Sequence, residues 1–221
     1  MTDPVSPVAR PGSGDVVARF WDDHAHEYDR RMTLTERWFL RRGRDFINAR
    51  AAGDVLEVGV GTGATLAGYR YGAEGVTSVV AIDVSARMGE IAAARLAQLP
   101  VPARWVLVDG SEPLPTSVAQ DQFDTVVASL VLCSVPDVDE SLAAFAQVLR
   151  PGGQLLLLDH VASSLAPVRW GQRLLEPGVA RRTGERFTRR PREHLARHGF
   201  EVVESGRAHL GIVEWVRARR G

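Results

Sequence analysis

Three acidic residues are the first candidates for ligand binding or catalysis. Each lies within or next to an apolar run that is typical of a buried strand. Glu57 lies within the first run, Asp83 ends the second, and Asp109 follows the third. Ionised carboxylates only accept hydrogen bonds, which suits ribose hydroxyls, amino groups and cations. Three such charges at successive strand ends would repel a pyrophosphate. The acids therefore favour a ligand that carries a positive charge, a ribose and an adenine.

A glycine loop follows Glu57 directly. The stretch 54–63 reads D-V-L-E-V-G-V-G-T-G and places Gly59, Gly61 and Gly63 at alternate positions. Glycine permits sharp turns and leaves room for a ligand to approach the backbone. A strand, a glycine turn and a helix form the nucleotide-binding arrangement at the carboxyl edge of a parallel sheet. The loop also fits the G-x-G-x-x-A fingerprint, which leaves a dinucleotide cofactor open.

The elements that must position these residues alternate along the chain. Apolar runs predict strands at 55–58, 76–82, 103–108, 123–130, 154–158, 200–205 and 210–216. Helical patterns and caps predict helices at 15–32, 35–51, 64–71, 85–99, 137–149 and 192–198, with a turn at 150–153. This alternation predicts an α/β, doubly wound, Rossmann-like fold. We expect a mostly parallel seven-stranded sheet with helices on both faces and an N-terminal helical cap.

The length of 221 residues suits a single domain. We expect five parts: a disordered segment at 1–13, a helical cap at 14–51, a cofactor-binding core at 52–160, an acceptor-side cap at 161–191, and a closing helix and strands at 192–221. The segment 161–191 breaks the strand–helix rhythm. Its five arginines between positions 181 and 190 would either form a solvated face or steer an acidic acceptor.

Composition excludes several classes of protein. The hydrophobic share of 45% and the charged share of 24% are ordinary for a soluble globular protein. A net charge of zero argues against a general nucleic-acid binder, and all 27 cationic side chains are arginine. The single cysteine, Cys133, excludes an internal disulfide and a cysteine metal cluster. We expect no bound metal. We also expect the protein to be located in a reducing compartment, the cytoplasm. We expect no transmembrane segment, and a monomer or a homodimer.

Several motifs together resemble those of the class I S-adenosylmethionine-dependent methyltransferases, over about residues 15–218. They are L-E-V-G-V-G-T-G at 56–63, I-D-V-S at 82–85, D-G-S-E-P-L-P at 109–115, F-D-T-V-V-A-S-L-V-L at 123–132 and L-R-P-G-G at 149–153. The resemblance implies S-adenosylmethionine as cofactor, S-adenosylhomocysteine as product and a small-molecule acceptor. It implies cofactor binding by Tyr28, Glu57, Gly59, Gly61, Gly63, Asp83, Val84, Met88, Asp109, Gly110, Ser129 and Leu130.

Within this set the resemblance implies particular roles. Asp83 would accept both ribose hydroxyls, and Val84 and Met88 would sandwich the adenine. Glu57 would act at the amino group of the cofactor or through a water molecule nearby. Tyr28 would belong to a helix that closes over the cofactor.

The acceptor side is less specified, because methyl transfer from a sulfonium mainly requires alignment of the nucleophile and exclusion of water. His160, after the fifth strand, is the first candidate for a catalytic base. His24 and His26, in the N-terminal helix, are two further candidates. The apolar residues that we expect to face the acceptor are Trp21, Trp38, Phe39, Trp170 and Leu174.

A closer resemblance points to one acceptor. The motifs L-V-L-C-S-V at 130–135, L-R-P-G-G at 149–153 and D-H-V-A at 159–162 look like those of the alkyl-thiol S-methyltransferases of animals and their bacterial relatives. This implies S-methylation of a small apolar thiol. O- or C-methylation of a secondary metabolite or a quinone, and phospholipid N-methylation, stay open.

Two alternatives lie outside this class: a nicotinamide-dependent oxidoreductase and a non-catalytic cofactor-binding protein. The lack of lysine argues against a Tyr-Lys hydride site.

Overall fold

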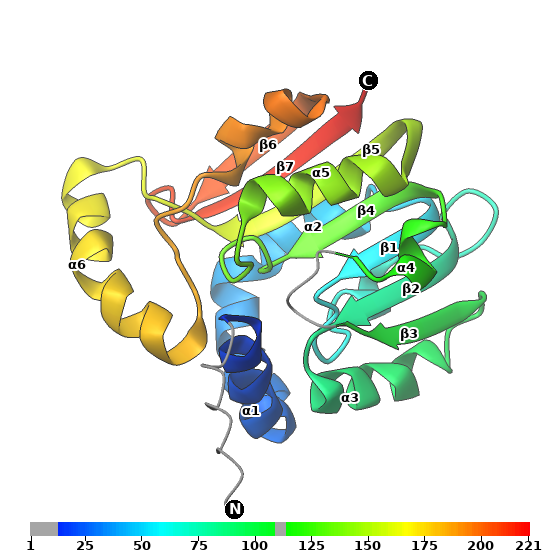
Figure 1. Cartoon of the computed structure of the whole chain (residues 1–221), viewed down its shortest axis with the longest axis horizontal. Helices are drawn as coiled ribbons and strands as arrows, with labels where there is room; N and C mark the ends of the chain where they lie inside the picture. Colours follow the sequence, from blue (N-terminus) through cyan, green and yellow to red (C-terminus); the bar gives the residue numbers. More distant parts are fainter. Residues whose placement is uncertain (1–12, 109–113) are drawn as a thin grey trace, which may run out of the picture.

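A computed structural model describes residues 13–108 and 114–221. Its centre is one seven-stranded sheet in the order β3-β2-β1-β4-β5-β7-β6 (Figure 1). The strands are β1 Gly53–Val58, β2 Val76–Asp83, β3 Ala103–Leu107, β4 Phe123–Ser129, β5 Leu149–His160, β6 Phe200–Ala208 and β7 Val213–Arg220. Strands β1 to β5 pair in parallel, whereas β7 pairs antiparallel with both β5 and β6. The predicted doubly wound α/β fold is confirmed.

The helices divide between the two faces of this sheet. They are α1 Ser13–Thr35, α2 Arg41–Asn48, α3 Ala86–Leu96, α4 Thr116–Ala119, α5 Val138–Val148 and α6 Ala166–Thr183. A π-helical turn at Glu36–Leu40 joins α1 to α2, and 3-10 turns occupy Leu66–Gly68 and Pro191–His198. We expected one helix to end at residue 32 and the next to begin at residue 35. In the structure the chain stays helical throughout this region, and only the type of helix changes.

Two apolar cores form because successive strand residues face opposite sides of the sheet. In β5, Leu155 and Leu157 join the core that α5 covers, whereas Leu156 and Leu158 join the core that α2 and α3 cover. A strand that is buried on both faces has no solvent-facing side, so polar and apolar residues do not alternate along it. This is why the sequence reads as continuous apolar runs.

Several local predictions were wrong. The strand expected at 210–216 begins only at Val213 and continues to Arg220, and the helix expected at 192–198 is a 3-10 turn. The helix expected at 64–71 is only the 3-10 turn Leu66–Gly68, after which Tyr69 is extended with φ −68° and ψ 146°. This extension lets the buried Tyr69 hydroxyl reach Glu57. The turn expected at 150–153 belongs to β5, because Leu149 already pairs with Phe123 before the register shifts.

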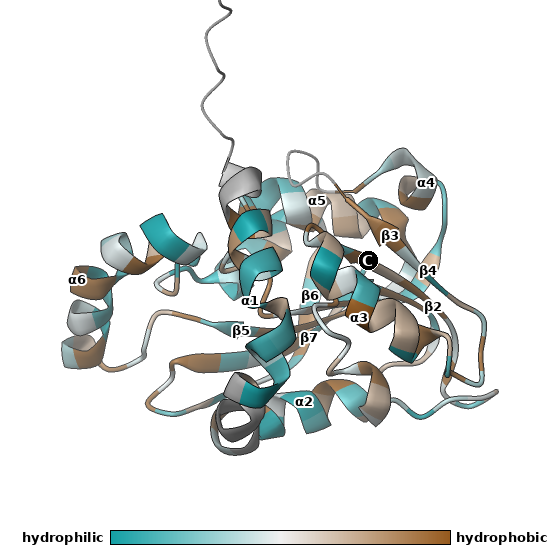
Figure 2. Ribbon diagram, turned by 90° about the horizontal axis from the view of Figure 1, so that it is seen from below, coloured by the Kyte–Doolittle hydropathy of each residue, from teal (hydrophilic) through white to brown (hydrophobic). Residues whose placement is uncertain are grey.

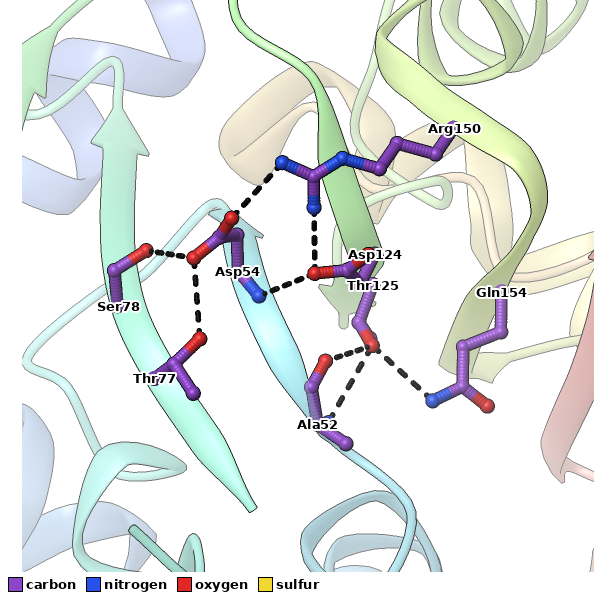
Figure 3. Close-up of polar contacts among 8 residues, drawn as sticks. All are labelled: Ala52, Asp54, Thr77, Ser78, Asp124, Thr125, Arg150 and Gln154. Atoms are coloured by element: carbon purple, nitrogen blue, oxygen red, sulfur yellow. Dashed lines mark hydrogen bonds and ion pairs between the residues drawn. The ribbon is translucent and has the colours of Figure 1, made fainter. Parts of the chain in front are cut away.

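The amino-terminal edge of the sheet is held by a polar network (Figure 3). Arg150 contacts Asp54 at 2.9 Å and Asp124 at 2.6 Å, and Asp124 also accepts the Asp54 amide at 2.8 Å. The Ser78 hydroxyl donates to Asp54 at 2.7 Å, which together with Arg150 lowers the pKa of Asp54. The L-R-P-G-G motif thus ties β1, β4 and β5 together at the edge opposite the candidate site.

Helix α6 stands at one side of the molecule, away from the sheet (Figures 1 and 2). Its inner side is anchored by Gln172, whose amide donates to the Val161 carbonyl at 3.0 Å and accepts the Ser163 amide at 2.8 Å. None of the helices in the described ranges is both long enough and apolar enough to span a membrane.

Candidate functional site

The glycine loop leaves β1 in a conformation that requires glycine. Gly59 and Gly61 have φ values of 63° and 55°, in the left-handed region. The Gly61 amide donates to Asp83 at 2.7 Å, and the Val60 amide donates to the Ile82 carbonyl at 3.1 Å. A Cβ atom at Gly61 would meet nothing within 4 Å, so its outer side is open. Hydrogen bonds to the end of β2 therefore hold the loop in place, while the side of Gly61 that a Cβ atom would occupy is open to a ligand.

Asp83 ends β2 beside this loop and is only 7% exposed. Its second oxygen accepts the Ser85 amide at 2.9 Å, and Ser85 in turn caps α3 by accepting the Met88 amide. Burial raises the pKa of Asp83, while the backbone amides of Ser85 and Gly61 oppose the rise. The result is an oriented carboxyl group with its remaining acceptor capacity free for a ligand.

A cavity of about 470 Å³ opens at the carboxyl ends of β1, β2, β4 and β5. Its lining includes these residues expected from the sequence: Trp21, His24, Tyr28, Gly59, Gly61, Asp83, Val84, Met88, Ser129, Leu130 and His160. Leu130 has a φ of 61°, which is rare for a leucine, and its amide donates to the Leu158 carbonyl at 2.7 Å. Backbone strain of this kind collects at functional sites.

Other expected residues lie elsewhere. Gly63 and Glu57 do not line the cavity, and His26 is exposed on α1. Trp38, Phe39, Trp170 and Leu174 are also exposed, because the helical segments that carry them turn those side chains outward. Asp109 and Gly110 lie outside the described residues, as do positions 1–12 of the expected disordered segment.

Glu57 is buried behind the glycine loop and does not line the cavity. The Tyr69 hydroxyl donates to it, and burial raises the pKa of Glu57 to about 7. Arg44 of α2 lies close enough to oppose that rise electrostatically. The same guanidinium donates to Thr65 at 2.6 Å and to Ser129 at 3.1 Å. Glu57 thus belongs to a polar cluster that supports the loop, and Arg44 was not found from the sequence.

Helix α1 covers the cavity and is attached at two points. Asp22 accepts the Ser85 hydroxyl at 2.6 Å and the Arg87 amide at 3.1 Å, at the start of α3. Asp29 accepts the Thr62 hydroxyl at 2.6 Å and contacts Arg95. We call these two attachments the α1 latches. Sequence reasoning found the helix but not the latches, since their partners lie 33 to 66 positions away along the chain.

His160 lines the cavity at the end of β5, and the buried Asp159 directly precedes it. Asp159 is buried and accepts the Cys133 amide at 3.2 Å and the His160 amide at 3.0 Å. Burial raises the pKa of Asp159 to about 7 and lowers the pKa of His160. His160 is therefore neutral at physiological pH and able to take up a proton. Cys133 is a buried core thiol whose pKa burial raises, as expected from its apolar run.

His24 faces the same cavity from α1. Its Nδ1 lies 2.7 Å from the Phe20 carbonyl, and its ring stacks on the Phe20 ring with centroids 4.3 Å apart. Because a carbonyl only accepts hydrogen bonds, the His24 Nδ1 is the donor in this contact, and Nε2 is the ring nitrogen not engaged by it.

The cavity lining combines apolar and acidic groups. Phe20, Val131, Val135 and Phe145 supply the apolar wall. The carboxyl groups are Asp83, Asp137, Glu140 and Glu185, and the described lining contains no arginine. Burial raises the pKa of Glu185, and the hydrogen bond from the Thr183 hydroxyl at 3.3 Å opposes that rise. Glu185 gave no motif signal in the sequence.

The arginines of 181–190 do not line the cavity. Arg189 instead donates to the Leu132 and Val135 carbonyls at 2.8 and 2.6 Å and so holds the loop after β4. The described cavity lining thus contains four carboxyl groups and no arginine. This charge distribution favours a cationic or neutral ligand over an anion.

The known proteins that this chain resembles are methyltransferases. Residues 56–157 match the family described as "Methyltransferase domain". The chain is 29% identical, over 92% of its length, to the mitochondrial methyltransferase OMS1 of Saccharomyces cerevisiae, and covers 46% of that protein. It is 31% identical, over 68% of its length, to the thiol S-methyltransferase TMT1A of Homo sapiens, and covers 60% of it. The chain thus spans about half to three-fifths of these relatives.

A solved structure shares the fold across nearly the whole chain. The geranyl diphosphate C-methyltransferase of Streptomyces coelicolor A3(2) superposes with a TM-score of 0.70 at 14% identity. The match covers 97% of this chain and 100% of that one. At this identity the likeness concerns the fold.

Proposed function

The chain carries a methyltransferase domain of the class I S-adenosylmethionine-dependent family, and on that premise we propose that it methylates a small, apolar molecule in the cavity beneath α1. The observation that carries the proposal is the Gly61–Asp83 hydrogen bond at 2.7 Å in the cavity wall. It joins the glycine loop to the acid at the end of the next strand. A glycine loop held against an acid at the end of the next strand is an arrangement that can bind the ribose of a nucleoside cofactor.

The residues present fit S-adenosylmethionine. Asp83 offers acceptor capacity to ribose hydroxyls, and the open outer side of Gly61 leaves space for the methionine part. Met88 and Val84 offer an apolar seat for the adenine. The cofactor supplies a methyl group that is already activated by a sulfonium. The negative lining suits this cation, and the lack of arginine in the described lining disfavours a dinucleotide pyrophosphate.

A small thiol is the first candidate for the acceptor. Phe20, Val135 and Phe145 provide a wall that suits an apolar body. The acceptor sulfur would form a bond to the methyl carbon while the sulfonium C–S bond breaks and its electron pair stays on the departing sulfur. The thiol proton would pass to His160, which is neutral before the reaction because burial lowers its pKa. The similarity to a thiol S-methyltransferase supports the same choice.

An amine is the second candidate, and one observation favours it. Glu185 and Glu140 place carboxyl groups on the acceptor side of the cavity, where they would attract an ammonium group. The same groups disfavour a phosphate or a carboxylate. Phenols, quinols and phospholipid amines are the remaining acceptors within the class.

Binding and turnover test these proposals separately. Isothermal titration with S-adenosylhomocysteine and NADH should show binding of the first only. Tight binding of NADH alone would refute the cofactor assignment. Methyl-labelled cofactor should then be incubated with an alkanethiol, a primary amine, a phenol and a quinol. Labelled thioether supports the thiol, and labelled amine supports the second candidate. Cofactor binding without any labelled product would favour a non-catalytic protein.

The base is tested by His160→Gln, with His26→Gln as the matched control because His26 is exposed on α1. We expect His160→Gln to lower turnover of a phenol roughly 100-fold and of a thiol less, since a thiol ionises nearer neutral pH. Equal loss with both acceptors would mean that His160 positions groups without taking the proton.

A further inference from the structure

Helix α6 presents large apolar side chains to solvent. Trp170, Leu174 and Leu175 are 66%, 62% and 67% exposed, and Leu165 is exposed just before the helix begins. Trp170 and Leu174 are four residues apart and so share one side of the helix. Gln172, two residues from each, is buried on the opposite side. The exposure therefore follows from how α6 is anchored and involves an entire helix face.

Exposed arginines accompany these apolar side chains. Arg173, Arg181 and Arg182 are exposed on α6. Glu176 is the one acidic residue of the helix. It is partly buried and accepts the Thr188 amide at 2.6 Å. The helix surface is thus apolar and positively charged. We call Leu165, Trp170, Leu174 and Leu175, with these three arginines, the α6 surface.

The apolar region continues beyond the helix. The exposed Leu210 lies beside the start of α6, because its carbonyl accepts the Ser163 hydroxyl at 2.5 Å. The neighbouring His209 ring lies 4.5 Å from the exposed Phe39 ring. Of the ten large hydrophobic residues found exposed in the described ranges, four belong to the α6 surface and Leu210 lies beside it.

We propose that the α6 surface docks on the surface of an anionic lipid bilayer. Tryptophan and leucine on one side of a helix, flanked by arginine, are the combination that binds a bilayer interface without spanning it. The arginines complement the negative charge of acidic lipid headgroups. Helix α6 lies at one side of the molecule, away from the sheet, so the body of the protein does not cover its outer side (Figures 1 and 2).

Docking at this surface bears on access to the cavity. Thr183 ends α6 and Glu185 follows it, and both line the cavity. Gly184 between them lies against Val17 of α1, so the end of α6 also touches the covering helix. A bilayer at α6 would therefore lie beside the cavity wall, where an apolar acceptor dissolved in lipid can be delivered.

Co-sedimentation with vesicles tests the proposal directly. The full chain should sediment with vesicles of phosphatidylcholine and phosphatidylglycerol at 7:3, and at least fivefold less with pure phosphatidylcholine or at high salt. Trp170→Glu combined with Leu174→Glu should reduce sedimentation with the mixed vesicles at least tenfold. Val203→Glu is the control, because Val203 is an exposed apolar residue that lies on β6, outside the α6 surface. It should leave sedimentation unchanged.

Folding and self-association are checked on the same proteins. The double variant should keep the circular dichroism spectrum and the affinity for S-adenosylhomocysteine of the unchanged chain. Absence of sedimentation with the mixed vesicles, or equal sedimentation of the double variant, would overturn the proposal. A dimer of the unchanged chain that the double variant converts to a monomer would also overturn it, since the surface would then be an interface between two copies.

Discussion

Asp83 shows how one carboxyl group serves both the fold and the candidate site. It accepts the amides of Gly61 and Ser85 and so joins the glycine loop to the start of α3. Burial makes its negative charge costly, and the two amides oppose that cost. A ligand hydroxyl that donates to the same carboxylate would add a charge-assisted hydrogen bond.

Asp83→Asn should therefore weaken the binding of S-adenosylhomocysteine by roughly 10- to 100-fold, which is the loss of one or two charge-assisted hydrogen bonds. Isothermal titration measures the change. Glu140→Gln is the matched control, because it makes the same chemical change in the cavity lining on the acceptor side. Unaltered affinity in Asp83→Asn would remove this residue from the cofactor site.

At the scale of elements, helix α1 is a cover whose position depends on the α1 latches. Asp22 and Asp29 bind the start of α3 and the glycine loop, respectively. Both partners belong to the wall that the cofactor would contact. Helix α1 and the glycine loop are thus coupled through a few partly buried polar contacts.

Asp22→Asn and Asp29→Asn should each raise the dissociation rate of S-adenosylhomocysteine by about 3- to 10-fold, since each latch is worth about 1 kcal/mol. Stopped-flow measurements of ligand release provide the test. Asp23→Asn is the control, because Asp23 is exposed on the same helix. A release rate that stays constant in both latch variants would show that α1 does not limit exit.

The packing of α3 on β3 depends on a glycine. A Cβ atom at Gly89 would collide with the Trp105 ring. Gly89→Ala should therefore destabilise the fold by about 1–3 kcal/mol, as overpacking does. Gly178→Ala in α6 is the matched control: nothing lies within 4 Å of its Cβ position, so the change should be neutral or stabilise by up to about 1 kcal/mol. Urea unfolding of both variants measures the difference, and equal stability would contradict the packing argument.

At the scale of the whole molecule, two buried acids make stability depend on pH. The pKa values of Glu57 and Asp159 are both raised to about 7 by burial, from 4.5 and 3.8. The folded state therefore holds their protons more tightly than the unfolded chain. Their contribution is complete below about pH 4 and is lost as the pH rises through 7.

We expect the free energy of unfolding to fall between pH 5 and pH 8. The part due to Glu57 is about 2–3 kcal/mol. Glu57→Gln should remove this part and flatten the curve, whereas the exposed Glu140→Gln should leave the curve unchanged. Urea unfolding at several pH values tests this. A fall of the same size in Glu57→Gln would assign the dependence to other groups.

The sequence by itself determined the fold class, the glycine loop and the acid at the end of β2. Continuous apolar runs, glycine spacing and strand-end acids are local signals, and the sheet topology brings those strand ends together. The L-R-P-G-G motif was likewise recognised as structural, although its place inside β5 depends on the pairing of Leu149 with Phe123.

Only the tertiary structure decided which side chains face the cavity. It placed Glu57 under the loop because Tyr69 and Arg44 arrive there from distant segments. It turned Trp170 and Leu174 outward because Gln172 anchors the other side of α6. It brought Glu185 inward although no motif marks that position. Orientation of this kind depends on long-range packing, and a pattern of neighbouring residues does not encode it.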